Sequence, residues 1–82
     1  MAKYRKKPVV IDAWMIPSDD EGKLMLLKWM GSGRIDRDGS LVVATLEGEM
    51  KGAVGDMLIQ GVSGEFYPCR RDIFEKTYEP AD

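Results

Sequence analysis

Residues 18–31 read Ser-Asp-Asp-Glu-Gly-Lys-Leu-Met-Leu-Leu-Lys-Trp-Met-Gly and carry the clearest helix signal in the chain. Ser18 precedes Glu21 by three residues, which is the spacing of a capping box, where each side chain satisfies the other's free backbone N–H. The acids after Ser18 place negative charge at the positive end of the helix dipole. Gly31 tolerates the left-handed conformation that ends many helices. We predict a helix over residues 19–30.

The second half of this helix is apolar nearly all the way round. Six of the seven residues 24–30 are apolar, so their side chains point around the helix instead of along one stripe. A single helix on a small sheet needs only one buried face. The excess predicts either an interface with another subunit or target, or a face covered by the C-terminal tail. The predicted interface residues are Leu24, Leu27, Trp29 and Met30.

The segments on either side of the helix predict strands and tight turns. Residues 9–16 are rich in β-branched and aromatic side chains and are closed by Pro17. Asp38-Gly39, between apolar runs, is a signal for a two-residue hairpin. Further strands are predicted over residues 34–36, 41–46, 49–53, 57–60, 65–68 and 77–79, with one helical turn over 72–75.

Connections this short join antiparallel strands, because parallel strands need long crossovers. The sequence therefore predicts an α+β fold, with one main helix packed on a strongly bent, mostly antiparallel sheet of about five or six short strands. A chain of 82 residues has room for one domain, here residues 1–82 with residues 1–8 as a basic arm. Such a chain buries only roughly 60–65% of its unfolded surface, so its core is thin.

The composition suits a folded protein of the cytosol. Hydrophobic residues make up 44% and charged residues 32% of the chain, which is ordinary for a globular domain. The single cysteine, Cys69, cannot form an intrachain disulfide, as expected for a reducing compartment. We expect no membrane span and no signal peptide, since the apolar run after the basic start is broken by Asp12.

Positive charge is concentrated at the N-terminus. The first eight residues hold four basic side chains and no acid, whereas the other 74 hold 8 basic and 14 acidic ones. This polarity fits an anionic partner at the arm, and it also fits a solvated basic start that keeps an edge strand soluble. The basic residues are Lys3, Arg5, Lys6 and Lys7.

Several kinds of catalytic and metal site are excluded by composition. The chain has no histidine and one cysteine, which removes the commonest general base, a thiolate–imidazole zinc site and the histidine-dependent nucleophilic pairs. Asp36 and Asp38 flank a turn and could form a carboxylate pair, but acids in turns already have a structural explanation. We expect no enzyme activity, no metal and no cofactor.

Arg70 and Arg71 are the strongest candidates for binding an anion. They precede a predicted helical turn, whose free N–H groups add to their positive charge. With Tyr67, Lys6 and Lys7 they could form a basic, aromatic surface. The alternative is that the arginines pair with nearby acids, namely Glu65, Asp72 or Glu75.

Two further questions concern the state of Cys69 and the kind of ligand. The neighbouring arginines would lower the pKa of an exposed Cys69 thiol, whereas a packed thiol would be inert. The sequence pI of about 5.1 disfavours general nucleic-acid binding. A small anionic ligand fits the charge distribution better.

Both ends of the chain resemble small tailed-phage and prophage proteins of the PGDYG type. The resemblance covers roughly 50 residues: 4–13 at the start, then 45–50, 55–56, 61–69 and 72–80. Its most specific part is the Gly-Glu-Phe-Tyr-Pro-Cys run at residues 64–69. The chain departs from the pattern at Val54, where proline is usual, and at Met57, where an aromatic residue is usual.

The resemblance implies a phage or prophage accessory gene expressed inside a bacterium. Small phage proteins of this kind often block a host system, by binding a host protein or by sequestering a nucleotide-like ligand. We therefore expect an oligomeric binding protein of the bacterial cytosol that inhibits a host defence or metabolic system. The alternative is a nucleic-acid-binding protein that uses the basic N-terminal arm.

Overall fold

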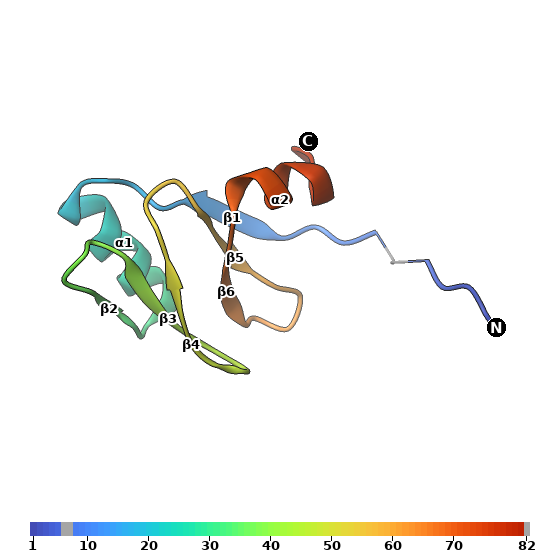
Figure 1. Cartoon of the computed structure of the whole chain (residues 1–82), viewed down its shortest axis with the longest axis horizontal. Coiled ribbons are helices and arrows are strands. Elements are labelled where there is room, and N and C mark those ends of the chain that lie inside the picture. The colour runs from blue at the N-terminus through green and yellow to red at the C-terminus, as the bar shows by residue number, and fades with distance from the viewer. Residues whose placement is uncertain (6–7, 82) are drawn as a thin grey trace.

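The computed structural model describes residues 1–5 and 8–81, which form two helices and six strands. The order of elements is β1 (Asp12–Met15), α1 (Asp20–Met30), β2 (Arg34–Ile35), β3 (Leu41–Thr45), β4 (Gly48–Gly52), β5 (Met57–Gln60), β6 (Phe66–Cys69) and α2 (Arg71–Thr77). Figure 1 shows α1 beside the strands and α2 near the C-terminus. The predicted α+β class is confirmed, and every strand pair is antiparallel.

The strands form two separate sheets, so the prediction of one bent sheet of five or six strands is wrong. Their orders are β1-β5-β6 and β2-β3-β4. β6 lies against β3 and β4 without pairing with them. Pro68 in β6 has no N–H to donate to a further strand, which suits an edge position. A Cβ on Gly52 in β4 would lie 3.1 Å from Pro68 Cβ and 2.6 Å from Ile16 Cδ1. Glycine therefore allows β4 to pack closely on the first sheet.

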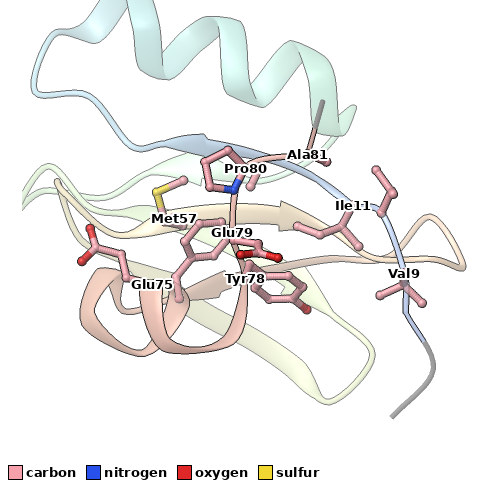
Figure 2. A pocket seen from close by; sticks show the side chains of 11 residues that line it. Val9, Ile11, Met57, Glu75, Tyr78, Glu79, Pro80 and Ala81 are labelled. Atoms are coloured by element: carbon pink, nitrogen blue, oxygen red, sulfur yellow. The ribbon is translucent and has the colours of Figure 1, made fainter.

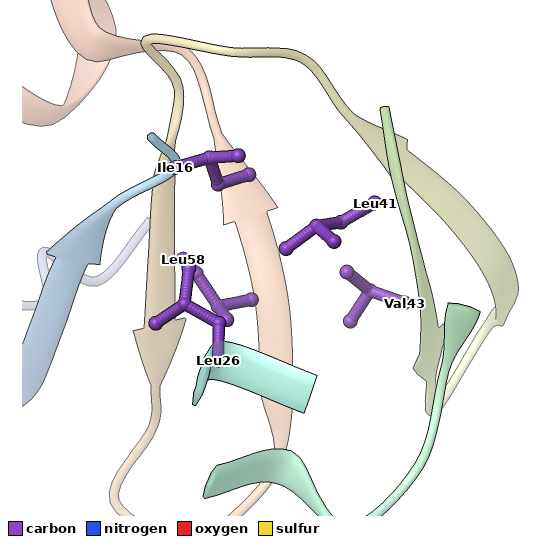
Figure 3. Packing of buried hydrophobic residues seen from close by; sticks show 5 residues of the cluster. All are labelled: Ile16, Leu26, Leu41, Val43 and Leu58. Atoms are coloured by element: carbon purple, nitrogen blue, oxygen red, sulfur yellow. The ribbon is translucent and has the colours of Figure 1, made fainter. Parts of the chain in front are cut away.

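The core lies between these two sheets and α1. Figure 3 shows Ile16, Leu26 and Leu58 facing Leu41 and Val43 across the interior. All five side chains are buried, and four of them are completely inaccessible to solvent. Burying one side chain of this kind contributes roughly 1.5–3 kcal/mol. These contacts join the first sheet, the helix and the second sheet into one unit.

The position of α1 explains most of the apolar residues in its second half. Leu27, Trp29 and Met30 are half-buried and pack against the core cluster. Trp29 makes an edge-to-face contact with Phe66 of the first sheet, with ring centroids 5.0 Å apart. A Cβ on Gly33, next to β2, would lie 3.2 Å from Leu27. The helix thus packs against both sheets. Of the four predicted interface residues, Leu24 alone is largely exposed.

The helix boundaries agree with the prediction, but the N-cap does not. The helix runs over Asp20–Met30 and ends at Gly31, whose φ of 74° is left-handed. Asp19, not Ser18, is the N-cap, and its carboxylate accepts a hydrogen bond from the Gly22 N–H at 2.8 Å. An aspartate already lies one residue nearer the helix, so the Ser18–Glu21 capping box does not form.

Two other local predictions are wrong in detail. The first strand is shorter than residues 9–16, because its partner β5 ends at Gln60, opposite Asp12. The hairpin between β2 and β3 has a three-residue loop: the Gly39 N–H donates to Asp36 O and the Asp36 N–H donates to Ser40 O. Gly39 has φ of 85°, as a type I turn with a glycine bulge requires.

The C-terminal segment forms more helix than predicted and no strand. The predicted single turn over residues 72–75 is the helix α2, Arg71–Thr77. Residues 77–79 do not form the predicted strand. Thr77 Oγ1 donates to Ile73 O at 2.9 Å, and the Phe74 and Tyr78 rings lie 5.2 Å apart. The ring contact, between residues four apart, stabilises the helix.

The identity of the N-cap can be tested by substitution. We predict that Asp19→Ala lowers the free energy of unfolding by about 1 kcal/mol, because the Gly22 N–H loses its partner. Ser18→Ala should leave stability nearly unchanged, and it is the matched control. Urea unfolding of both variants provides the measurement. A larger loss for Ser18→Ala than for Asp19→Ala would show that the cap is assigned wrongly.

Candidate functional site

An apolar groove lies between β1 and α1. Its volume is about 500 Å³. Trp14 of β1 and Met25 of α1 are exposed by 61% and 68%, and Met15 is also exposed. No charged side chain lines this groove. The complete lining is Trp14, Met15, Pro17, Gly22, Met25, Leu26 and Trp29.

The groove follows from the way the chain turns between β1 and α1. Ile16 is completely buried and anchors the end of β1, and its N–H donates to Asp56 O at 2.8 Å. Pro17 and the cap at Asp19 then start the helix within a few residues. Trp14 and Met25 therefore flank one depression although they are 11 residues apart. Large exposed aromatic and methionine side chains are enriched where proteins bind other proteins.

A second hollow lies on the α2 side of the first sheet, with a volume of about 620 Å³. Figure 2 shows it between the segment around Ile11 that leads into β1, the side chain of Met57, and the segment from Glu75 to Ala81. Its floor is apolar, but Glu75 and Glu79 are both part of its wall. Two carboxylates make this hollow unfavourable for an anion.

The two predicted anion-binding arginines are both exposed, and each is paired with an acid. Arg70 lies 2.9 Å from Asp72, and Arg71 lies 3.0 Å from Glu75. An Arg71 N–H also points at the sulfur of Met15 at 3.3 Å. The arginines therefore form the ion pairs expected as the alternative to anion binding, with Asp72 and Glu75 as the acids. Exposed ion pairs contribute little stability, so they fix the side chains only weakly.

The other predicted ligand residues do not join the arginines in one site. Tyr67 is half-buried, and its hydroxyl lies 3.4 Å from that of Tyr78. Burial first, and then this hydrogen bond, raise the pKa of Tyr67 well above its usual range. The phenol is therefore neutral at physiological pH. Lys6 and Lys7 lie outside the described residues.

Cys69 is half-buried. Burial raises the pKa of its thiol, and the carboxylates of Asp56 and Asp72 raise it further. The Sγ donates a weak hydrogen bond to Arg70 O at 3.5 Å. A thiol with a raised pKa is a poor nucleophile at neutral pH, so these observations fit the packed reading.

Asp36 and Asp38 face Lys51 rather than forming an acid–base pair. Lys51 Nζ lies 2.5 Å from Asp36 and 3.6 Å from Asp38. The hydrogen bond from Lys51 lowers the pKa of Asp36, and hydrogen bonds from Ser40 lower the pKa of Asp38. A general acid at neutral pH needs a raised pKa instead. Both carboxylates are ionised and hold the β2–β3 turn against β4.

No group of His, Cys, Asp and Glu side chains within residues 1–5 and 8–81 is arranged to hold a metal ion. In the same residues, neither helix has the length and apolar character needed to cross a membrane. Comparisons with models of protein families, with curated proteins and with solved structures each gave no match.

The pH dependence of stability tests the role of Lys51. Asp36 has a lowered pKa, so its contribution is present at neutral pH and is lost as the pH falls through that lowered pKa, below its usual 3.8. We predict that Lys51→Gln lowers the melting temperature slightly at pH 7, because the pair is exposed. The difference from wild type should disappear in strong acid. Arg37→Gln, in the same turn, is the control and should show no such pH dependence. A constant difference for Lys51→Gln at every pH would contradict the ion-pair role.

Proposed function

We propose that this chain is a phage or prophage accessory protein that acts in the host bacterial cytosol by binding a host protein and inhibiting a defence or metabolic system. The apolar groove between β1 and α1 carries this proposal. The phage origin in this proposal rests on the family resemblance of residues 4–13 and 64–69. The binding role rests on the exposure of Trp14, Met15 and Met25 beside one another.

A protein segment with apolar side chains is the occupant that this groove favours. The lining offers apolar contact area and no ionic side chain. Tryptophan supplies large contact area at low entropic cost, and methionine adapts its shape to the partner. Exposed apolar residues gathered in one place are a mark of protein interaction sites. One anchoring side chain of a partner, inserted between Trp14 and Met25, would fill the groove.

A small anionic ligand is the less favoured form of the same proposal. Arg70 and Arg71 are already neutralised by Asp72 and Glu75. The larger hollow nearby carries Glu75 and Glu79 on its wall. An anion at the arginines would have to displace Asp72 and Glu75, and an anion in the hollow would be repelled by Glu75 and Glu79. These charges favour a protein partner over a nucleotide-like one.

A binding role also suits the chemistry of the ionisable groups. Asp36 and Asp38 have lowered pKa values, and Cys69 and Tyr67 have raised ones. The lowered pKa values make the two carboxylates poor general acids at neutral pH, and the raised pKa of Cys69 makes its thiol a poor nucleophile. We therefore propose a binding protein and not an enzyme.

The groove can be tested by capture of a host protein. We predict that Met25→Glu and Trp14→Thr each reduce capture of the specific partner at least tenfold. The first places a charge against the apolar side chain of the partner, and the second removes the ring that this side chain would contact. Leu46→Glu is the matched control, since Leu46 is 87% exposed at the β3–β4 turn. Quantitative pull-down from the host lysate, followed by binding assays with the purified partner, provides the measurement. Equal loss in all three variants, or no loss in the groove variants, would contradict the proposal.

Native mass spectrometry of the protein purified from its host at low salt addresses the small ligand. The protein-partner proposal predicts no bound mass in the nucleotide range. A bound nucleotide that disappears in Arg70→Ala and Arg71→Ala would replace the groove with the arginine site as the place of action.

The N-terminal arm keeps nucleic-acid binding as a second candidate. Lys3 and Arg5 are exposed, and no described residue pairs with them. If the arm binds nucleic acid, the affinity should fall steeply with rising salt, because released counterions drive such binding. Fluorescence anisotropy with single- and double-stranded DNA, with Lys3→Gln/Arg5→Gln as the variant, is the measurement. Binding that does not change with salt or with the variant would remove this candidate.

A further inference from the structure

β1 is an edge strand with an open side. It pairs with β5 alone, at one end of the β1-β5-β6 sheet. The backbone N–H of Ile16 donates to Asp56 O, and its C=O accepts from the Gly55 N–H, so Ile16 directs both groups toward β5. Because backbone direction alternates along a strand, the N–H and C=O groups of Ala13 and Met15 point outward. No strand of the described residues pairs with that side.

This edge lacks the usual protection against pairing with another chain. Natural edges are blunted by lysine, by proline within the strand, by a bulge or by a covering element. Residues 12–15 are Asp-Ala-Trp-Met. Trp14 and Met15 are exposed by 61% and 47%, and the one charge is that of Asp12. An exposed apolar edge of this kind is a template for strand addition.

The charges at the two ends of β1 are opposite. Lys3 and Arg5 lie in the arm that precedes the strand, and Asp20 and Glu21 begin the helix that follows it. Figure 1 shows residues 1–5 far beyond one end of β1 and the start of α1 beyond the other end. All four side chains belong to exposed residues, and none forms an ion pair with another described residue.

We propose that β1 pairs in antiparallel fashion with β1 of a second copy, so that two three-stranded sheets join into one of six strands. An antiparallel pair places the basic arm of each copy beside the acidic helix start of the other. A parallel pair would place arm beside arm and acid beside acid, which like charges disfavour. The occupant of this edge is therefore a second copy related by a twofold axis.

The register follows from the same strand. Opposed residues of an antiparallel pair share one face of the sheet, so a twofold axis must pass through a residue. An axis at Asp12 would oppose two carboxylates, and an axis at Trp14 would bring Pro17 opposite Ile11, where an N–H is needed. An axis at Ala13 avoids both problems. It opposes Asp12 to Trp14 of the second copy and allows Ala13 and Met15 to use their outward backbone groups.

The dimer and the host-protein groove depend on different groups of β1. The pairing uses the backbone edge of β1, whereas the groove uses the side chains of Trp14 and Met25 on the α1 side. In the dimer, the two grooves lie on the same face of the joined sheet, on either side of the axis. The oligomeric state therefore tests the edge independently of any host partner.

Sedimentation velocity over a concentration series tests the strand edge. The expected result is a wild-type dimer whose dissociation constant rises with salt. Ala13→Pro should be monomeric at concentrations where the wild type is a dimer, because proline removes the outward N–H that would bind the second copy. The variant should still fold, since an edge strand tolerates proline where the N–H faces solvent. Val54→Pro, in an exposed turn, is the matched control and should remain dimeric. Thermal melting shows whether each variant is folded. A wild type that is monomeric throughout, or a folded Ala13→Pro variant that still dimerises, would overturn the proposal.

Charge exchange tests the orientation without relying on the proline variant. Lys3→Glu/Arg5→Glu and Asp20→Lys/Glu21→Lys should each weaken the dimer about tenfold, as expected for a few exposed ion pairs. The variant with all four changes should recover dimerisation, because the charges are complementary again. Glu47→Lys, at the distant β3–β4 turn, should have no effect. Loss without recovery in the fourfold variant would overturn the antiparallel arrangement. A monomer that still captures a host protein would overturn the dimer and leave the proposed function standing.

Discussion

The packing of Leu26 against both sheets is the interaction on which the rest of this structure depends. Its side chain meets Ile16, which follows β1, and Leu58 of β5, and it faces Leu41 and Val43 of the second sheet. A chain of 82 residues has a thin core, so these few contacts must hold three layers together. Removing one such side chain typically costs about 2–5 kcal/mol, which is a large share of the stability of a small domain.

This constraint decides which parts of the fold the sequence could predict. The helix, β5 and the antiparallel connections are local signals: a cap and a terminal glycine for α1, and short turns between β-rich runs for the strands. The split into two sheets is not local, because it depends on how β4 meets β6. Gly52 and Pro68 are 16 residues apart, and neither gives a signal until they pack together. Leu27, Trp29 and Met30 are apolar because the helix packs against two sheets, a possibility that a single-sheet prediction does not contain, whereas Leu24 and Met25 remain exposed.

The candidate sites divide in the same way. The sequence predicted Arg70 and Arg71 as anion-binding residues and gave pairing with nearby acids as the alternative, and the structure pairs them with Asp72 and Glu75. The apolar groove was not predicted, because Trp14 and Met25 come together only through the turn at residues 16–19. A signal was present in β1, where a tryptophan follows Asp12 on the same face of a short strand. The structure leaves Trp14 exposed beside the helix.

The small size of the chain links the groove to the open strand edge. β5 is the central strand of its sheet and is buried on both faces at Leu58 and Ile59. Its neighbour β1 has no further strand to cover it, because the remaining strands are used in the second sheet. Covering Trp14 and Met15 within one chain would require another element. The apolar surface that the core cannot bury is therefore left on one edge, next to the basic arm and the acidic helix start. An edge strand with exposed apolar side chains, and with opposite charges beyond its two ends, has properties expected of an interface.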